Sequence, residues 1–169
     1  GEYTLGLIYG GRGAGSPGYQ DKTELWNGTS WTETTDLNTT LGTHGSAKNG
    51  TPSATVAFGA ATSSPTIVAS TSEWIGSGVA VLSWAAGNNM NTARYLHGGA
   101  GTQTAGLAFG GDADGNSALT ESYDGTSWTE VNDLNTARQV GAACGIQTAA
   151  LIFGGGFPPN FGETELFNG

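Results

Sequence analysis

Positive charge is the scarcest feature of this sequence. Only 5 of its 169 residues are Lys or Arg, against 14 Asp and Glu, and the net charge at pH 7 is −9. The cations are scattered along the chain: Arg12, Lys22, Lys48, Arg94 and Arg138. A surface that binds nucleic acid or an anionic membrane needs a basic patch that pairs with phosphates. We therefore expect no nucleic acid and no membrane among the partners.

Cysteine and long apolar runs are also scarce. The single cysteine, Cys144, cannot form a disulfide within the chain, and its small neighbours Ala143 and Gly145 predict a buried, unreactive thiol. No apolar run approaches the ~20 residues that cross a bilayer as a helix. The first residues contain neither a basic start nor a long apolar stretch, so no secretory signal is expected there.

Glycine, by contrast, is abundant. The 30 glycines stand beside many Ser, Thr and Asn residues, all of which are poor helix formers because they free the backbone or compete for its hydrogen bonds. The chain is 37% apolar and has five Trp, five Tyr and six Phe, which is enough to bury a core. We therefore expect an all-β fold that forms a single domain over residues 1–169.

The strongest feature of the sequence is an internal repeat. Four similar segments are GEYTLGLIYGG, GTPSATVAFGA, GTQTAGLAFGG and GIQTAALIFGG. They start 49, 51 and 44 residues apart, which defines units 1–49, 50–100 and 101–144 and an incomplete unit 145–169. The second unit diverges, since ten residues separate Trp74 from Trp84 where five separate Tyr123 from Trp128. The chain thus holds about three and a half repeats.

Each complete unit is predicted to form four short antiparallel strands. Compact apolar runs such as Ala149–Phe153 end at a Gly pair, which is typical of buried strands. Asn27-Gly28 and Asp124-Gly125 predict two-residue hairpin turns, because both dipeptides tolerate positive φ. Four strands in a period of 44 to 51 residues are typical of a β-propeller blade.

One order of motifs recurs through the chain. A strand ends in a Gly pair, Tyr123-Asp124-Gly125 follows, Trp128 comes next, and Asn-Thr-Ala-Arg precedes a Gly- and Ala-rich strand. This order resembles the kelch repeat, although unit two has Gly-Ala for the Gly pair and Trp-Ile-Gly for Tyr-Asp-Gly. The resemblance covers essentially the whole chain and implies a kelch-like β-propeller of four-stranded blades. The Thr- and Asn-rich style also resembles tandem kelch-like repeats in virion or tail proteins of environmental bacteriophages.

Repeated residues are interpreted first as structural. Trp31, Trp84 and Trp128 occupy equivalent places, and we expect each to pack between adjacent sheets and bury roughly 150–250 Å². The Gly pairs are expected where backbones crowd together near an axis, so that a side chain there would clash.

An arginine ends the Asn-Thr-Ala-Arg motif in two units. The kelch-like arrangement implies that Arg94 and Arg138 reach across to a neighbouring carboxylate or carbonyl, with Glu121 and Glu165 as the expected acceptors. The first unit has Leu41 in the corresponding stretch, so no such contact is expected there.

The strand count leaves the propeller incomplete. Three, four, four and three strands are expected in successive blades, where the first lacks its innermost strand and the last lacks a Thr-Ser-Trp strand. Propellers close with about four to eight blades. The chain is therefore part of a longer protein, receives strands from a neighbouring subunit, or polymerises through open edges. We favour the first of these.

No catalytic constellation is evident, so the protein is predicted not to be an enzyme and to need no cofactor. Copper-radical oxidases similar to galactose oxidase share the kelch-like fold, and His44, His97 and Cys144 could be compared with their ligands. No tyrosines stand in an arrangement that completes such a site, and surface or inter-blade histidines are the simpler interpretation.

One loop resembles a calcium-binding sequence. Asp112-Ala-Asp114-Gly-Asn116 resembles the opening of a calcium loop, but Ser117 and Tyr123 stand where an EF-hand needs Gly and Glu. A looser site with ligands Asp112, Asp114 and Asn116 is the alternative to an ordinary polar turn.

The loops between the first and second strands of each unit vary most. They are Arg12–Lys22, Ala61–Val68, Asp112–Ala118 and Gly156–Glu163. Equivalent loops should gather on one face, where a rigid scaffold presents them to a ligand. The candidate ligand residues are Tyr19, Asp21, Asp112, Asp114, Phe157 and Phe161.

These features favour a non-enzymatic structural or binding module of an extracellular or virion assembly, which presents its loops to protein partners or to copies of itself. The alternative is a glycan-binding, lectin-like domain of a phage fibre or secreted surface protein, because aromatic rings beside carboxylates suit sugars as well as proteins.

Overall fold

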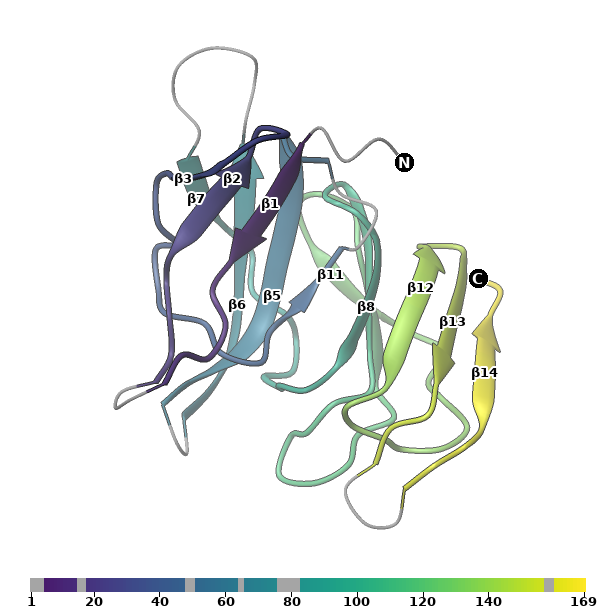
Figure 1. The fold of residues 1–169 in the computed structure, drawn as a ribbon. Coiled ribbons are helices and arrows are strands. Elements are labelled where there is room, and N and C mark those ends of the chain that lie inside the picture. Colours follow the sequence, from purple (N-terminus) through teal and green to yellow (C-terminus); the bar gives the residue numbers. More distant parts are fainter. Residues whose placement is uncertain (1–4, 15–17, 48–50, 64–65, 76–82, 157–159) are drawn as a thin grey trace.

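The chain consists of β-strands and connections throughout the part that the structure describes. The computed structural model describes residues 5–14, 18–47, 51–63, 66–75, 83–156 and 160–169. Within these ranges it has fourteen strands and no helix, and so no helix that is long and apolar enough to cross a membrane. The strands form four antiparallel sheets that follow one another in chain order (Figure 1). The all-β fold class is confirmed.

The four sheets share one plan. The first contains β1 (Gly6–Tyr9), β2 (Thr23–Trp26) and β3 (Trp31–Glu33). The second contains β4 (Gly45–Ser46), β5 (Ala54–Ser63), β6 (Thr66–Ile75) and β7 (Ser83–Gly87). The third contains β8 (Gly98–Thr102), β9 (Ala105–Phe109), β10 (Thr120–Tyr123) and β11 (Trp128–Val131). The fourth contains β12 (Ala142–Ile146), β13 (Ala149–Phe153) and β14 (Thr164–Phe167).

The distribution of strands follows the repeat. Three, four, four and three strands were expected in successive sheets, and the structure has the same numbers. In the described residues the first sheet has no counterpart of β4, β8 and β12, and the fourth has no counterpart of β7 and β11. Both β1 and β14 are therefore edge strands.

The second sheet departs from the other three. Its central strands β5 and β6 have ten residues each, where the corresponding strands elsewhere have four or five. Pairing continues past Phe58↔Thr71 to Ser63↔Thr66, with two register shifts along the way. The prediction of a variable loop at Ala61–Val68 is therefore wrong. The Thr, Ile and Val residues there suit a pleated surface, and the strands continue through them.

The predicted two-residue hairpin turns are wrong in length. Tyr123 pairs with Trp128, which leaves four residues in the connection. One carboxylate oxygen of Asp124 accepts hydrogen bonds from the N–H groups of Thr126 and Ser127, both at 2.7 Å. These bonds close a wider turn, and they lower the pKa of Asp124. The first sheet makes the same turn at its Asn-Gly, and in both sheets the following strand pairs back antiparallel as expected.

Three apolar clusters hold the sheets together, one at each junction. Between the first and second sheets lie Leu37, Leu41, Ala57, Ala60, Trp74 and Trp84. Between the second and third lie Ala47, Val56, Phe58, Met90, Ala108, Tyr123 and Trp128. Between the third and fourth lie Ala100, Leu107, Phe109, Ala143, Ala150 and Ile152. The core therefore lies between consecutive sheets, as it does in a propeller, and Figure 1 shows the first and fourth sheets at opposite ends of an open stack.

Glycine is required where the second strand of a unit passes close to the connection that leads to the next sheet. Gly59 and Gly110 have φ of 50° and 67°. A Cβ on either would lie 2.6 Å from the carbonyl oxygen of Arg94 or Arg138, respectively. The expected clash is therefore confirmed at Gly110. The equivalent Gly154 has room for a Cβ, since the nearest atom would be 3.7 Å away.

Candidate functional site

The loops that join β1 to β2, β9 to β10 and β13 to β14 lie at one end of the stack. Figure 1 shows them at its lower edge, beside the end of the β5–β6 hairpin. Equivalent connections in equivalent sheets point the same way, so the described parts of these loops share one end of the molecule. This end is the first candidate surface.

The ring of Tyr19 packs against other residues of the protein. The guanidinium of Arg12 lies 5.8 Å from the centre of the Tyr19 ring, and the two residues also pair through their backbones. The ring packs on Gly42 so closely that a Cβ there would overlap it. Asp21 is half-buried, and its carbonyl oxygen accepts the N–H of Leu37 at 2.8 Å. Much of the Tyr19 ring is therefore used in contacts within the protein, with Arg12 of its own loop and Gly42 of the connection from β3 to β4.

Asp112 orders the third-sheet loop. Its Oδ1 accepts the N–H of Gly115 at 2.9 Å, and its Oδ2 accepts the hydroxyl of Tyr95 at 3.4 Å. Asp114 is exposed with φ of 67°, and Asn116 pairs with Asp112 through the backbone. Among the described residues, no group of three or more His, Cys, Asp or Glu side chains could hold a metal ion. A calcium site with ligands Asp112, Asp114 and Asn116 stays a prediction.

The fourth-sheet loop offers one described aromatic side chain. Phe161 is half-buried, and the guanidinium carbon of Arg138 lies 5.6 Å from the centre of its ring. Phe157, the other aromatic residue predicted for this loop, lies outside the described residues. Carbohydrate binding at the loop end therefore stays a prediction, and two of its aromatic rings already have an arginine partner within the protein.

His44 and His97 pack at sheet junctions in equivalent positions. His44 stacks on Tyr9 and His97 on Phe58, each with ring centres 5.3 Å apart. Burial and the nearby Arg94 lower the pKa of His97 to about 3, and burial also lowers the pKa of His44. Both rings are neutral at pH 7. This geometry agrees with the inter-blade interpretation of the two histidines.

Each of the last two junctions contains the expected ion pair. Arg94 Nη2 lies 3.2 Å from Glu121 Oε1, and Arg138 Nη2 lies 2.6 Å from Glu165 Oε1. Each carboxylate also accepts N–H groups from the segment before the arginine, the shortest bonds being 2.7 and 2.6 Å. Burial would raise the pKa of Glu165, but these bonds and Arg138 lower it overall. The predicted Arg–Glu contacts are confirmed.

The first junction replaces both members of the pair. Leu41 stands at the place of the arginine and is 1% exposed. Ser72 stands at the place of the glutamate, since it pairs with Ala57 as Glu121 pairs with Ala108. One backbone arrangement therefore accepts an apolar junction as well as an ionic one.

Trp31 differs from its two equivalents. It is 46% exposed, whereas Trp84 and Trp128 are 5% and 6% exposed. The indole N–H of Trp84 donates to Thr23 of the preceding sheet, and that of Trp128 to Thr71, both at 2.9 Å. The expectation that all three tryptophans pack between sheets is wrong for Trp31, because the described residues form no sheet in front of the first one.

The two outward faces of the stack expose large apolar side chains. We call the outward face of the first sheet the front face, where Ile8 and Trp31 are exposed beside the carboxylates of Glu24 and Glu33. We call the outward face of the fourth sheet the rear face, formed by Cys144, Ile146, Leu151, Phe153 and Leu166. Phe153 is 42% exposed, although its equivalents Phe58 and Phe109 are at most 2% exposed. Each of those two is covered by the next sheet.

The rear face corrects two sequence predictions. Cys144 is exposed rather than buried. The run Ala149–Phe153 is buried only at alternate residues, since its other side lies on the rear face. Sequence reasoning missed both outward faces as surfaces. The strand count was the available signal. In an open stack of equivalent sheets, each end sheet exposes one face whose equivalents are buried between the inner sheets.

Known proteins resemble this chain in fold but not in sequence. No protein-family model matches the chain, and no curated protein matches it. The solved structures that match include "Structure of YjhT", with a TM-score of 0.76 and 11% identity over 89% of this chain and 50% of that one. The chain thus spans about half the length of that structure. Identity this low shows the fold alone, which is a propeller-like stack of antiparallel sheets.

Proposed function

We propose that the chain is a non-enzymatic structural and binding module of an extracellular or virion assembly, with kelch-like blades that belong to a larger or oligomeric propeller. The observation that carries this proposal is the pair of outward faces, each of which exposes large apolar side chains. Each is the equivalent of a face that is buried at all three internal junctions. The loops at one end offer a further surface for protein contact.

The front and rear faces correspond to the two opposite sides of an internal junction. At an internal junction, the aromatic residue of β1, β5 or β9 (Tyr9, Phe58 or Phe109) faces the sheet that follows. The rear face presents Phe153 in that role, and the front face presents Ile8 and Trp31 in the receiving role. A rear face seated on a front face therefore repeats an internal junction. Exposed apolar surface of this kind marks a site of protein contact.

The other parts of the proposal have separate support. The virion or extracellular setting rests on the resemblance of the Thr- and Asn-rich repeats to those of bacteriophage virion proteins. The non-enzymatic role is supported by the packing of His44 and His97, because each ring stacks on an aromatic side chain at a sheet junction.

Two variants that each block one face test this function by sedimentation velocity. Trp31→Glu blocks the front face, and Leu151→Glu blocks the rear face. We expect the unchanged chain to form larger species as concentration rises, and each variant alone to stay monomeric. A mixture of the two variants should form a heterodimer and nothing larger, since one free rear face meets one free front face.

The matched control is Thr129→Glu, a new charge at an exposed position of β11, which should associate like the unchanged chain. Association should also increase with salt, because screening weakens repulsion between copies with a net charge of −9. A chain that stays monomeric at every concentration, or single variants that still associate, would contradict the proposal.

A further inference from the structure

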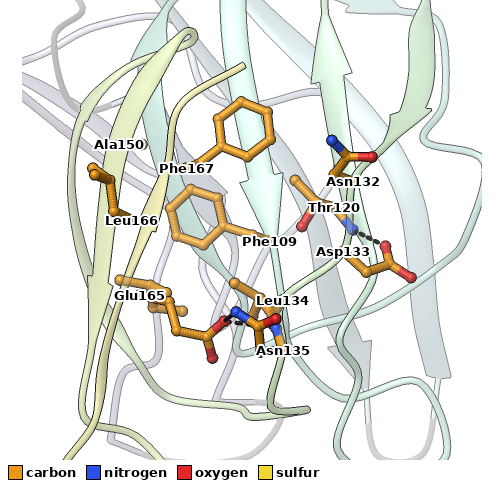
Figure 2. A pocket seen from close by; sticks show the side chains of 11 residues that line it. Phe109, Thr120, Asn132, Asp133, Leu134, Asn135, Ala150, Glu165, Leu166 and Phe167 are labelled. Carbon is orange, nitrogen blue, oxygen red and sulfur yellow. Dashed lines mark hydrogen bonds between the residues drawn. The ribbon is translucent and has the colours of Figure 1, made fainter.

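A cavity lies between the third and fourth sheets, beside the edge strand β14. Figure 2 shows that the rings of Phe109 and Phe167 lie on its walls, with Thr120, Leu134 and Asn135 around them. Thr120 and Phe109 are almost fully buried, at 1% and 2% exposed, whereas Phe167 is half-buried. The cavity therefore has a buried floor and lies next to a strand edge.

At the first junction, the indole of Trp84 occupies the corresponding place. Its ring centre lies 4.7 Å from that of Tyr9, in an edge-on arrangement, and 5.3 Å from that of Trp74. Its N–H donates to the hydroxyl oxygen of Thr23 at 2.9 Å. The side-chain amide of Asn38 donates to the backbone carbonyl of Trp84 at 3.3 Å.

At the second junction, Trp128 makes the same four contacts. Its ring centre lies 4.9 Å from that of Phe58, again edge-on, and 4.9 Å from that of Tyr123. Its N–H donates to the hydroxyl oxygen of Thr71 at 2.9 Å. The side-chain amide of Asn91 donates to the carbonyl of Trp128 at 3.2 Å.

All four partner positions recur around the cavity. Phe109 ends the second strand of its sheet, and Phe167 ends the third strand of the next. Thr120 begins β10, and Asn135 follows Leu134 in the connection to the fourth sheet. The Thr120 hydroxyl donates a hydrogen bond to the carbonyl oxygen of Ala118 at 3.5 Å. The lone pairs of the Thr120 hydroxyl oxygen can therefore still accept an N–H.

We propose that this cavity is a socket for the indole of a tryptophan carried by an incoming β-strand that pairs with the edge of β14. The indole would lie edge-on to Phe109, stack on Phe167 and donate its N–H to Thr120. The partner is an extended polypeptide segment of the type Thr-Ser-Trp-Thr, as in residues 126–129, and an edge strand binds such segments through its backbone groups. This inference deepens the proposed function. It depends on that function in one respect, which is that the partner is a polypeptide.

Two peptides test the socket by NMR titration of the isotope-labelled chain. One is Gly-Thr-Ser-Trp-Thr-Glu-Val, the sequence of residues 125–131, and the other has Ala in place of Trp. We expect the first to bind at least about ten-fold more tightly, because burial of an indole is worth that factor or more. The shifted signals should include Thr120, Asn135 and Phe167. Equal affinities, or shifts that map elsewhere, would overturn the proposal.

The variant Thr120→Val tests the hydrogen bond at nearly constant shape. Loss of one neutral acceptor should weaken binding of the Trp peptide by about 2- to 12-fold. Thr129→Val, at an exposed position of β11, is the matched control and should leave binding unchanged. An equal effect of the two variants would remove Thr120 from the socket.

A third measurement does not depend on the affinity of a free peptide. Thr-Ser-Trp-Thr-Glu is added after Gly169, and the comparison chain carries Ala in place of the added Trp. We expect the Trp chain to melt about 4 °C or more above the Ala chain. Equal melting temperatures would count against the socket but would leave the outward faces standing, since the sedimentation of the Trp31 and Leu151 variants tests those separately.

Discussion

The inner and outer sheets of this stack share one repeat but differ in what they bury. The second and third sheets are covered on both sides, whereas the first and fourth are covered on one. Trp128 and Trp31 hold the same place in their units, yet they are 6% and 46% exposed. Whether a repeated residue is buried is therefore decided by the adjoining sheet and not by the local sequence. Stability in such an array comes from contacts between neighbouring units.

The junctions themselves offer a second comparison. The second and third junctions bury an Arg–Glu pair, and the first holds Leu41 and Ser72 in the same places. A buried ion pair can often be replaced by apolar residues at little cost, but removal of one partner leaves a buried charge without compensation. The chain therefore contains both solutions to the same packing problem.

The largest effect is expected when one half of an ion pair is removed. Arg94→Leu leaves the Glu121 carboxylate buried without its cation and should lower the free energy of unfolding by about 3–5 kcal/mol. The double variant Arg94→Leu/Glu121→Ser copies the first junction and should recover most of that loss. Urea denaturation measures both. A double variant no more stable than the single one would show that the two kinds of junction are not interchangeable.

The tryptophans test the comparison of inner and outer sheets directly. Trp128→Ala should lower the free energy of unfolding by about 3 kcal/mol or more, because it opens a cavity between two sheets and leaves Thr71 without its donor. Trp31→Ala, the matched change on the front face, should cost less than about 1 kcal/mol. Thermal denaturation of dilute samples compares the two. Similar losses would mean that the front face is covered.

Acid should weaken the junctions that hold histidines. His97 has a pKa of about 3 in the folded chain and near 6.5 when unfolded, so the unfolded state binds more protons between these values. Stability is therefore complete above pH 6.5 and falls as the pH is lowered, by at most ~1.4 kcal/mol per pH unit from this group. Between pH 6.5 and 4.5, the free energy of unfolding of His97→Gln should fall by about 2 kcal/mol less than that of the unchanged chain, as measured by urea denaturation. Parallel pH profiles would contradict the assigned burial.

The smallest effect on stability is expected at Cys144. Because this thiol lies on the rear face, it should react with a thiol reagent in the native chain, and Cys144→Ser should change stability by less than about 0.5 kcal/mol. If rear faces seat on front faces, labelling should slow as protein concentration rises. If Cys144 reacts only after denaturation, the thiol is buried, as the sequence predicted, and does not lie on an exposed rear face.

The sequence predicted the order of strands because strand and turn signals are local and repeat with each unit. It also predicted the acceptors of Arg94 and Arg138, since the arginine and glutamate motifs recur in a fixed order. It could not predict the exposure of Trp31 or Cys144, which depends on the presence of a neighbouring sheet. The four-residue turns were missed because the side chain of Asp124 captures two backbone N–H groups, which widens the turn.

A further feature of the fold carries no visible sequence signal. Thr43, Leu96 and Val140 are not glycines, yet all have φ between 53° and 59° at equivalent points after each long connection. Leu96 donates its N–H to the carbonyl of Thr43 at 3.1 Å, and Val140 donates to Leu96 at 2.8 Å. These bonds tie one connection to the next, and they outweigh the local preference of the three residues for negative φ. The sequence also predicted that the fourth unit lacks a Thr-Ser-Trp strand. The place of the proposed socket, however, depends on the contacts that Trp84 and Trp128 make at the two preceding junctions, which no local signal gives.

Hydrogen exchange of the indole N–H groups, followed by NMR in dilute solution, tests most directly whether neighbouring sheets decide burial. The account predicts slow exchange at Trp84 and Trp128, whose N–H groups are bonded to Thr23 and Thr71 across a junction, and fast exchange at Trp31. Exchange at Trp31 that is as slow as at Trp84 in a monomeric sample would contradict it.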